Sequence, residues 1–405
     1  CSMLGGMRAV TWTQVAQYIV LIIAYLLPVF WISNNIGAGF FPHFMLADEV
    51  ARIAELEGQF GFVKNSAADL ATVPKGLSAI TKAHSSVNAT PWAFISLAVC
   101  MMAGTASLPH VMMRYFTTPS VRTARRSVGW SLFFIFLLYS SAPMLATLSK
   151  ISLMDPNLAT GIIGKSITEV QALDWYQNWN QAKLMFVSDF NGNGTLELNE
   201  FFMKGSAVVL ATPEIAGLPY VISGLVAAGG MAAAMSTADG LVLAISNALS
   251  HDVYYKIINP KAETAKRLIV ARVLLVLIGF AGATIAALEI QGILGSVIWA
   301  FDFAMSGLFF PLVLGVWWKR ANAPGAVAGM LLGLISGTAY LVWVRSGGSG
   351  FLGITQLTFG IVGASVSLVS MIVVSLITAA PDAATQKMVD DVRVPSGKTI
   401  LGKQH

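Results

Sequence analysis

The chain has 405 residues, of which 56% are hydrophobic and only 11% are charged, and its formal net charge is +5. Soluble globular domains carry about 25% charged residues, so lipid must cover much of the apolar surface of this chain. The modest positive charge needs no nucleic acid partner, because membrane proteins concentrate Lys and Arg on their cytoplasmic side. The composition therefore excludes a soluble protein and predicts an all-α polytopic membrane protein.

Eight apolar segments are long enough to cross a bilayer, which takes about 20 residues of helix. They are residues 9–33, 91–112, 127–152, 215–250, 266–288, 293–318, 322–345 and 353–378. Because the first segment follows closely on Cys1, which is not an initiator methionine, we expect an N-terminally truncated chain.

Lysine and arginine are concentrated in alternate loops between these segments. The loop 113–126 carries four arginines and no acidic residue, and the loop 251–267 and the turn 319–320 are also basic. In the intervening segments 34–90 and 153–214, acidic residues outnumber basic ones. The positive-inside rule then predicts a protein of the cytoplasmic (inner) membrane with both ends of this chain in the cytoplasm.

The loops also suggest how the chain is divided. We expect a transmembrane domain over 1–380, an extracytoplasmic insert over 153–214 within it, and a cytoplasmic tail over 381–405. The spacing of apolar residues predicts a short surface helix over 44–58. Because the tail is polar and contains Pro and Gly, we expect it to be poorly ordered.

Two hydroxyl side chains lie in the second apolar segment, shortly before a proline. Thr105 and Ser107 stand among apolar neighbours, and Pro109 interrupts the backbone hydrogen bonds of the helix. Backbone breaks of this kind line binding sites in membrane transport proteins, so Thr105 and Ser107 are candidate solute ligands. The alternative is an ordinary kink.

The most specific motif lies in the insert. Residues 189–200 fit the EF-hand pattern D-x-[DN]-x-[DN]-G-x5-E at every fixed position, with Gly194 at the sharp turn. The predicted calcium ligands are Asp189, Asn191, Asn193, the carbonyl of Thr195, Glu197 and Glu200. We expect a structural calcium ion here, followed by an exiting helix. The alternative is an Asn/Gly-rich turn without metal.

The fourth apolar segment carries two adjacent hydroxyls and a carboxylate among small residues. Ser236 and Thr237 could each bond a carbonyl one turn back, but an ionised Asp239 in lipid requires a cation or a proton. Sodium prefers hard oxygen ligands, as other hard cations do. Ser236, Thr237, Asp239 and a freed carbonyl of Ala233 are therefore the predicted sodium ligands.

A second carboxylate, Asp302, lies in the sixth apolar segment. We expect it to make a polar contact within the helix bundle, and it is also a candidate solute ligand. Ion coupling and pairing with Arg272 or Lys319 are the alternatives.

Four stretches resemble, in the right order, the sodium:solute symporter family. They are GGMRAVTWTQ (5–14), GTASLPHVMMRYFTTPSVRTARRS (104–127), AAAMSTADGLVLAISNALSHDVY (232–254) and VIWAFDFAMSGLFFPLVLGVWWKRANAPGAVAG (297–329). The second stretch is most similar to the cation/acetate (monocarboxylate) symporter branch, which carries a similar G-T-A-x-L-P-H. Their order along nearly the whole chain favours membership of this family.

The resemblance implies an inverted-repeat (LeuT-like) helix bundle, in which core helices 1–5 and 6–10 surround a central site. This chain would hold core helices 5–10 and two further helices, without core helices 1–4. In the family, the stretch around Ser236 and Thr237 lines a conserved sodium site, and helix 1 supplies further ligands. The chain would then hold half of each site.

One position departs from the family pattern. The family often has W-T-D where this chain has Trp12-Thr13-Gln14, and some members use that aspartate for a second sodium ion. We hypothesise that Asp239 replaces it as a charged ligand or carries a proton. The alternative is a hydrogen bond between Asp239 and Gln14.

These features together predict sodium-coupled symport of a small organic solute, with a short monocarboxylate such as acetate favoured by the resemblance of stretch 104–127. A proton-coupled symporter of another solute and a membrane sensor or receptor module on the same fold are the alternatives. We do not expect an enzyme, because the sequence has no Ser/His/Asp, HExxH or Cys/His cluster at membrane depth. The expected partners are the solute, sodium and the lipid bilayer, without nucleic acid; a small membrane subunit is left open.

Overall fold

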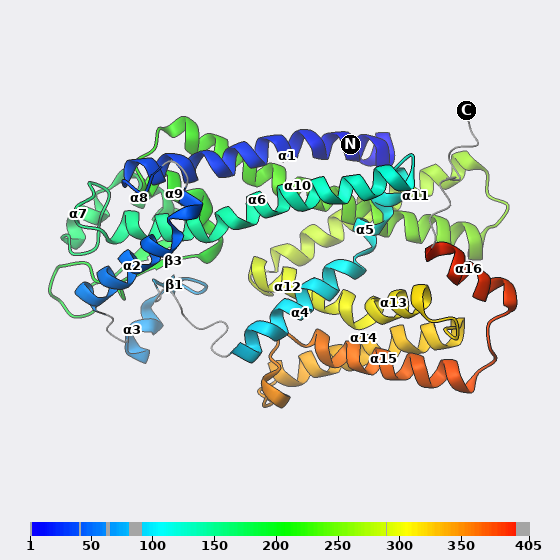
Figure 1. Cartoon of the computed structure of the whole chain (residues 1–405). Coiled ribbons are helices and arrows are strands. Elements are labelled where there is room, and N and C mark those ends of the chain that lie inside the picture. Colours follow the sequence, from blue (N-terminus) through cyan, green and yellow to red (C-terminus); the bar gives the residue numbers. More distant parts are fainter. Residues whose placement is uncertain (1, 40–41, 62–64, 81–90, 289, 394–405) are drawn as a thin grey trace. The chain divides into compact units, whose positions relative to one another are not determined.

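The computed structural model describes residues 2–39, 42–61, 65–80, 91–288 and 290–393, and it is built largely of helices (Figure 1). Within these residues, seven helices are long and apolar enough to cross a membrane, and a bent pair provides an eighth. These spans coincide with the eight segments predicted from the sequence, so the all-α polytopic membrane fold is confirmed. The chain divides into two compact units: unit 1 is Cys1–Ser85 with Trp130–Gly279, and unit 2 is Ser86–Gly129 with Phe280–His405.

Long helices form the first part of unit 1. They are α1 (Ser2–Asn35), α10 (Tyr220–Asn247), which continues into the π-helix η4 (Ala248–Ile258), and most of α6 (Val121–Met154) and α11 (Thr264–Ala287). Helix α1 lies along α10, and a Cβ added to Gly229 would lie 2.5 Å from the Cβ of Ala24 (Figure 1). The small side chains therefore allow these two helices to pack closely. Their buried core is completed by α6 and includes Val29, Ile32, Met144, Leu148, Ile222 and Val226.

Shorter elements form the rest of unit 1. They are η1 (Pro42–Phe44), α2 (Leu46–Phe60), α3 (Ala67–Thr72), α7 (Ile167–Gln171), α8 (Asp174–Gln181), η3 (Gly205–Ala207) and α9 (Val208–Ile215). A small antiparallel sheet has the strand order β1 (Ser78–Ala79), β3 (Phe201–Met203) and β2 (Met185–Val187), with Phe186 opposite Phe202. The predicted surface helix over 44–58 is confirmed as α2. The sheet was not predicted, because strands of two or three residues carry too little periodicity to be recognised.

The insert 153–214 and the helix α2 share one hydrophobic core. Buried side chains from α2, α7, α8, α9, the strands and the end of α6 form one cluster, and Tyr176, Met185 and Phe201 are among its members. Ion pairs border this core: Arg52 with Asp155 at 2.5 Å, and Lys150 with Glu57. The insert is therefore a packed body and not a long irregular loop.

Unit 2 begins with a broken span. Helix α4 (Pro91–Ser107) ends just before Leu108, and α5 (Pro109–Met112) with η2 (Met113–Thr117) continues at an angle of 49°. The predicted interruption at Pro109 is therefore present. The proline occupies the first turn of the new helix, where its missing N–H costs no hydrogen bond.

Four further helical segments complete the bundle of unit 2. They are α12 (Ile293–Ala304) with the π-helix η5 (Met305–Phe309) and α13 (Phe310–Trp317), then α14 (Ala323–Arg345), η6 (Phe351–Gly353) and α15 (Gly360–Ile377). Helices α14 and α15 lie side by side (Figure 1). A stripe of glycines at every fourth position of α14 faces this contact, and its members Gly325, Gly329, Gly333 and Gly337 are buried.

The expectation of a poorly ordered tail is wrong for part of the tail. Residues Ala383–Arg393 form helix α16, which buries Val389 and packs against α13. Lys319 binds Asp390 at 2.8 Å, and the guanidinium of Arg393 lies 5.7 Å from the ring centroid of Trp317. An apolar stripe with charges beside it stabilises a helix that composition alone does not reveal. The rest of the predicted tail, 394–405, lies outside the described residues.

Candidate functional site

The hydroxyls predicted to bind sodium lie near the middle of the span formed by α10 and η4. The hydroxyl of Ser236 donates a hydrogen bond to the carbonyl of Ala233 in its own helix, at 2.9 Å. Helix α10 is unbroken from Tyr220 to Asn247, so the carbonyl of Ala233 is not freed as the sequence suggested. Thr237 is exposed, whereas Ser236 is half-buried.

The neighbouring helix α1 contacts this region through Gln14. The side-chain amide of Gln14 donates to the main-chain carbonyl of Ser236 at 2.5 Å. Asp239 lies one turn further along α10, where it is half-buried and is not without an interaction partner. The position where the family often has an aspartate thus supplies an amide to the hydroxyl-bearing helix. Ser236, Thr237 and Asp239 remain predicted sodium ligands.

The two hydroxyls predicted to touch the solute end α4. Thr105 is exposed and donates to the carbonyl of Met101 at 2.6 Å. Ser107 is fully buried, and its hydroxyl lies 2.8 Å from the carbonyl of Ala103 and 2.9 Å from that of Gly104. Both hydroxyls therefore bond within their own helix next to the break at Leu108. Their contact with a solute remains a prediction.

Asp302 is the most deeply buried carboxylate of the membrane-spanning helices described. Its side chain lies between α12, α4 and the start of α15, and it has no exposed surface. The pairing with Lys319 considered from the sequence does not occur, because Lys319 binds Asp390. A solute does not reach Asp302 in this conformation.

The predicted calcium loop in the insert is closed by hydrogen bonds to its own backbone. The carboxylate oxygens of Asp189 accept from the N–H groups of Gly192 at 2.8 Å and Gly194 at 2.9 Å. Glu200 is fully buried and accepts from the N–H groups of Phe190 at 2.8 Å and Glu197 at 3.1 Å. Gly194 has φ of +70°, which explains why the sharp turn needs a glycine.

Other features of this loop differ from the expectation. The side-chain amides of Asn191 and Asn193 both donate to Oε1 of Glu197, at 2.8 and 3.0 Å. Among the described residues, no group of three or more His, Cys, Asp or Glu side chains is arranged to hold a metal ion. The loop leads into strand β3 and not into the expected helix, because Phe201 and Phe202 pair with β2 in the sheet. The structure thus shows an ordered loop, and calcium remains a prediction.

A family model described as the sodium:solute symporter family matches residues 2–166 and 204–333, which is well over half of the chain. The chain belongs to the sodium:solute symporter family. The resemblance predicted from the four sequence stretches is therefore confirmed. Members of this family are transporters, in agreement with the prediction that this protein is not an enzyme.

Individual relatives of this chain are also named as a symporter or a transporter. An uncharacterized symporter of Cupriavidus necator is 33% identical over 466 aligned positions, which cover 93% of this chain and 67% of that protein. A monocarboxylic acid transporter of Corynebacterium glutamicum is 28% identical over 245 positions, covering 60% of this chain and 37% of the transporter. The chain thus spans about two thirds of the first relative and little more than a third of the second.

A solved symporter structure supports the fold. The substrate-bound, outward-open state of a Na⁺-coupled sialic acid symporter superimposes with a TM-score of 0.57 and 17% identity. It covers 94% of this chain, and this chain covers 65% of it. At this identity the likeness concerns the fold alone.

The symporter family model passes over residues 167–203, between its two matched ranges. This stretch contains α7, α8, β2 and the whole of loop 189–200. The family's shared architecture therefore does not account for the loop.

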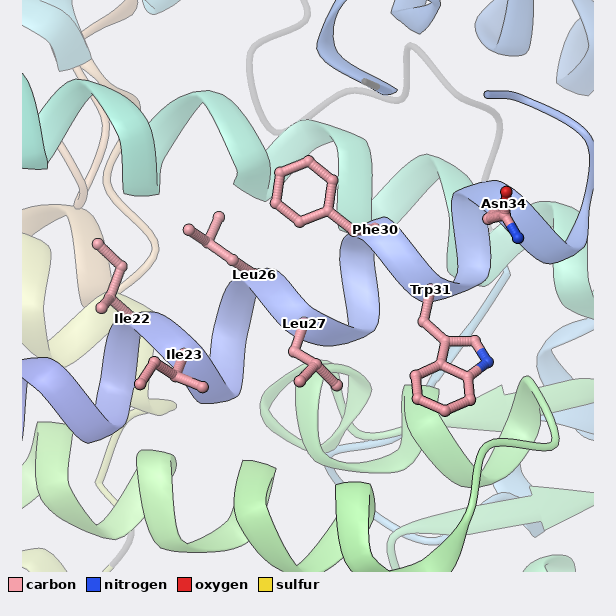
Figure 2. Close-up of a pocket in the computed structure, with 7 residues that line it drawn as sticks. All are labelled: Ile22, Ile23, Leu26, Leu27, Phe30, Trp31 and Asn34. Carbon is pink, nitrogen blue, oxygen red and sulfur yellow. The ribbon is translucent and has the colours of Figure 1, made fainter. Parts of the chain in front are cut away.

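A groove of ≈ 620 Å³ in this symporter chain is lined by residues of α1 (Figure 2). They are Ile22, Ile23, Leu26, Leu27, Phe30, Trp31 and Asn34, of which only Asn34 is polar. Apolar side chains such as Ile23 and Trp31 are between two fifths and one half exposed there, as expected for a surface that faces acyl chains or another helix. The groove contains none of the predicted sodium or solute ligands.

Sequence reasoning missed the neighbours of Asp302. The thiol of Cys100 on α4 and the backbone N–H groups of Phe359 and Gly360 lie beside its carboxylate. About 200 residues separate Cys100 from Asp302 along the chain. No spacing rule connects residues so far apart. Small residues allow helices to pack closely, and in the sequence only Gly104 and Gly360 indicate such packing here.

Proposed function

We propose that this chain forms part of a sodium-coupled symporter, in which α10 binds the sodium ion through Ser236, Thr237 and Asp239. The observation that supports this most directly is the contact between Gln14 and Ser236. It joins a polar position of α1 to the middle of a span that carries two hydroxyls and a carboxylate. Polar groups are costly at this depth and mark ion and substrate pathways.

The hydrogen bond of Ser236 to its own helix is compatible with this role. A hydroxyl oxygen that donates one proton keeps lone pairs that can bind a cation. Thr237 is exposed, so its hydroxyl is open to such an ion. The carbonyl of Ala233, the fourth ligand predicted from the sequence, is the least available of the four, because it already accepts from Ser236.

The proposed solute is a short monocarboxylate such as acetate, with Thr105, Ser107 and Asp302 as candidate contacts. The Corynebacterium glutamicum relative, named as a monocarboxylic acid transporter, supports this class. The break at Leu108 supports a binding site near Thr105, because interrupted helices present free backbone groups to ligands. Ser107 and Asp302 are fully buried, so either would first have to be uncovered.

For orientation we propose the cytoplasmic membrane, with both ends of this chain in the cytoplasm. The arginine-rich loop 113–126 and the basic turn at Lys319 and Arg320 would then lie on the same, cytoplasmic side. The insert around α8 and the sheet would face the opposite side.

Uptake of labelled acetate by proteoliposomes containing the full-length protein tests this function. We expect accumulation that depends on an inward sodium gradient and is lost in Asp239→Asn. The matched control is Asp252→Asn, because Asp252 lies on the same continuous span but is exposed and binds Lys256 at 3.2 Å. Binding of solute without gradient-driven accumulation would instead indicate a receptor. Accumulation driven equally well by a proton gradient without sodium would exclude sodium coupling.

We also propose that loop 189–200 of the insert binds a structural calcium ion through Asp189, Asn191, Asn193, the carbonyl of Thr195, Glu197 and Glu200. The sequence pattern and the turn at Gly194 support the proposal. Binding would require the side chains of Asn191 and Asn193 to present oxygen in place of the amide groups that now face Glu197.

Titration calorimetry of the purified protein with calcium chloride tests this loop. We expect heat of binding that is lost in Glu200→Gln and kept in Glu169→Gln, which alters an exposed carboxylate of α7 in the same insert. Equal binding by both variants, or none by the unaltered protein, would exclude a calcium site at this loop.

A further inference from the structure

A carboxylate without a hydrogen-bond partner is enclosed in unit 2. Asp302 on α12 has no exposed surface, and among the described residues neither of its carboxylate oxygens has a partner at hydrogen-bond geometry. The nearby hydroxyl of Ser306 is engaged elsewhere, because it donates to the main-chain carbonyl of Asp302 at 2.7 Å. Such a group needs an explanation, because buried polar groups in proteins are almost always bonded.

Two helices approach α12 closely around Asp302. A Cβ on Gly360, at the start of α15, would lie 2.8 Å from Oδ1 of Asp302. On the α4 side, a Cβ on Gly104 would lie 2.6 Å from the carbonyl oxygen of Phe301. The three helices therefore pack directly around the carboxylate. A proton can bind to the carboxylate without separating these helices.

The helices around Asp302 supply N–H dipoles but no full positive charge: the N–H groups of Phe359 and Gly360, at the start of α15, lie beside its carboxylate. Helix α4 brings a single titratable group, the thiol of Cys100, and the sequences of η5 and α15 contain none. The titratable residues of α14 are engaged elsewhere: the hydroxyl of Tyr340 donates to the carbonyl of Ile354 at 2.9 Å, and Arg345 lies 5.0 Å from the ring centroid of Trp299. No cation faces the carboxylate from any of these elements.

We propose that Asp302 is a proton-binding site, with its carboxyl group protonated in the packed conformation of α4, α12 and α15. An ionised carboxylate without a counter-ion is strongly disfavoured in a low-dielectric interior, and binding a proton removes the charge. The proton is released to water when the contact at Gly360 or Gly104 opens. This goes beyond the proposed function, since sodium-driven symport by itself requires no proton at this position.

The helix that carries Asp302 has a built-in irregularity next to it. The π-helix η5 begins at Met305, three residues after Asp302, and π-helical turns occur frequently at functional sites. In the proposal, α12 moves relative to α15 at this turn, and the movement admits water to the carboxyl group.

Infrared spectroscopy of the purified protein tests the proposal without any transport assay. With carbon-13-labelled aspartate, we expect a carbonyl stretch of a protonated aspartic acid at pH 7 in the unaltered protein. The band is lost in Asp302→Asn and kept in Asp390→Asn, which alters an aspartate of α16 that is about half exposed and binds Lys319. The absence of this band at pH 7, or its persistence in Asp302→Asn, would overturn the proposal whether or not the protein transports acetate.

Thermal unfolding provides a second, independent readout. An asparagine reproduces the size and neutrality of a protonated aspartic acid, so Asp302→Asn should unfold within about 2 °C of the unaltered protein. An ionised Asp302 with an unseen partner would instead make the variant much less stable. Failure of Asp302→Asn to fold would therefore also contradict a protonated Asp302.

Discussion

The side-chain amide of Gln14 donates a hydrogen bond to the main-chain carbonyl of Ser236 at 2.5 Å, and the bond links α1 to α10. The two residues are 222 positions apart in the chain. The bond holds a polar side chain of α1 against the part of α10 that carries the proposed sodium ligands. One prediction concerns this contact, and another concerns Thr237, the neighbour of Ser236.

Replacement of Gln14 by alanine should destabilise unit 1. The loss of a half-buried hydrogen bond costs about 0.5–1.5 kcal/mol in the free energy of unfolding. The measurement is thermal unfolding of Gln14→Ala in detergent. The control is Thr11→Ala, whose exposed hydroxyl bonds the carbonyl of Met7 in its own helix. A Thr11→Ala effect as large as that of Gln14→Ala would argue against a special role for the link.

Replacement of Thr237 by alanine should weaken sodium binding. We expect the sodium concentration for half-maximal acetate uptake to rise about tenfold, which corresponds to about 1.4 kcal/mol of binding free energy. Thr284→Ala serves as the control, because Thr284 is an exposed threonine of α11 that bonds the carbonyl of Phe280 in its own helix. An unchanged sodium dependence in Thr237→Ala would remove Thr237 from the proposed site.

Replacement of Gly333 by alanine should disrupt the packing of unit 2. A Cβ at this position would overlap the carbonyl oxygen of Ser306 and would approach the Cβ of Ser367 to 2.8 Å. Overpacking of this kind costs about 1–3 kcal/mol, because a backbone atom cannot move aside as a flexible side chain does.

The matched control for this packing prediction is Gly315→Ala in α13. A Cβ there would meet nothing within 4 Å, and alanine favours a helix over glycine by about 1 kcal/mol. Thermal unfolding should therefore show a lower melting temperature for Gly333→Ala and an equal or higher one for Gly315→Ala. The opposite order would contradict the described contact of α14 with η5.

Loss of Arg52 on α2 should strongly destabilise the contact of α2 with the insert. Two nitrogen atoms of Arg52 donate to Asp155, at 2.5 and 3.1 Å, and Asp155 is almost fully buried. Arg52→Gln leaves this carboxylate buried without its counter-ion, at a cost of about 3–5 kcal/mol. The control is Lys165→Gln, which removes an exposed lysine of the insert. Equal melting temperatures for the two variants would show that the ion pair contributes little.

The same carboxylate should make stability fall in acid. Burial opposes ionisation of Asp155, but the N–H of Asn157 and the hydrogen bonds and charge of Arg52 outweigh it and lower the pKa of Asp155. A lowered pKa contributes stability that is complete above the unfolded-state value of about 3.9 and is lost as the pH falls through the lower folded-state value. Below about pH 4, the melting temperature should therefore fall less in Asp155→Asn than in the unaltered protein. Parallel pH profiles would contradict this.

The sequence by itself determined the class of the protein and the positions of its spans. Low charge and eight long apolar segments require helices in a bilayer, because every backbone polar group in lipid must be bonded within its own segment. The order of the motifs also predicted the family. These properties depend on neighbouring residues along the chain, so they can be read locally.

Only the tertiary structure decided which polar groups meet. Gln14 contacts Ser236, and Cys100 lies beside Asp302, across separations that no periodicity encodes. The same holds for part of the tail, where α16 packs against α13 and Asp390 binds Lys319 just beyond α13. Such contacts depend on how apolar helix faces pack against one another, and many faces of similar composition compete for each position.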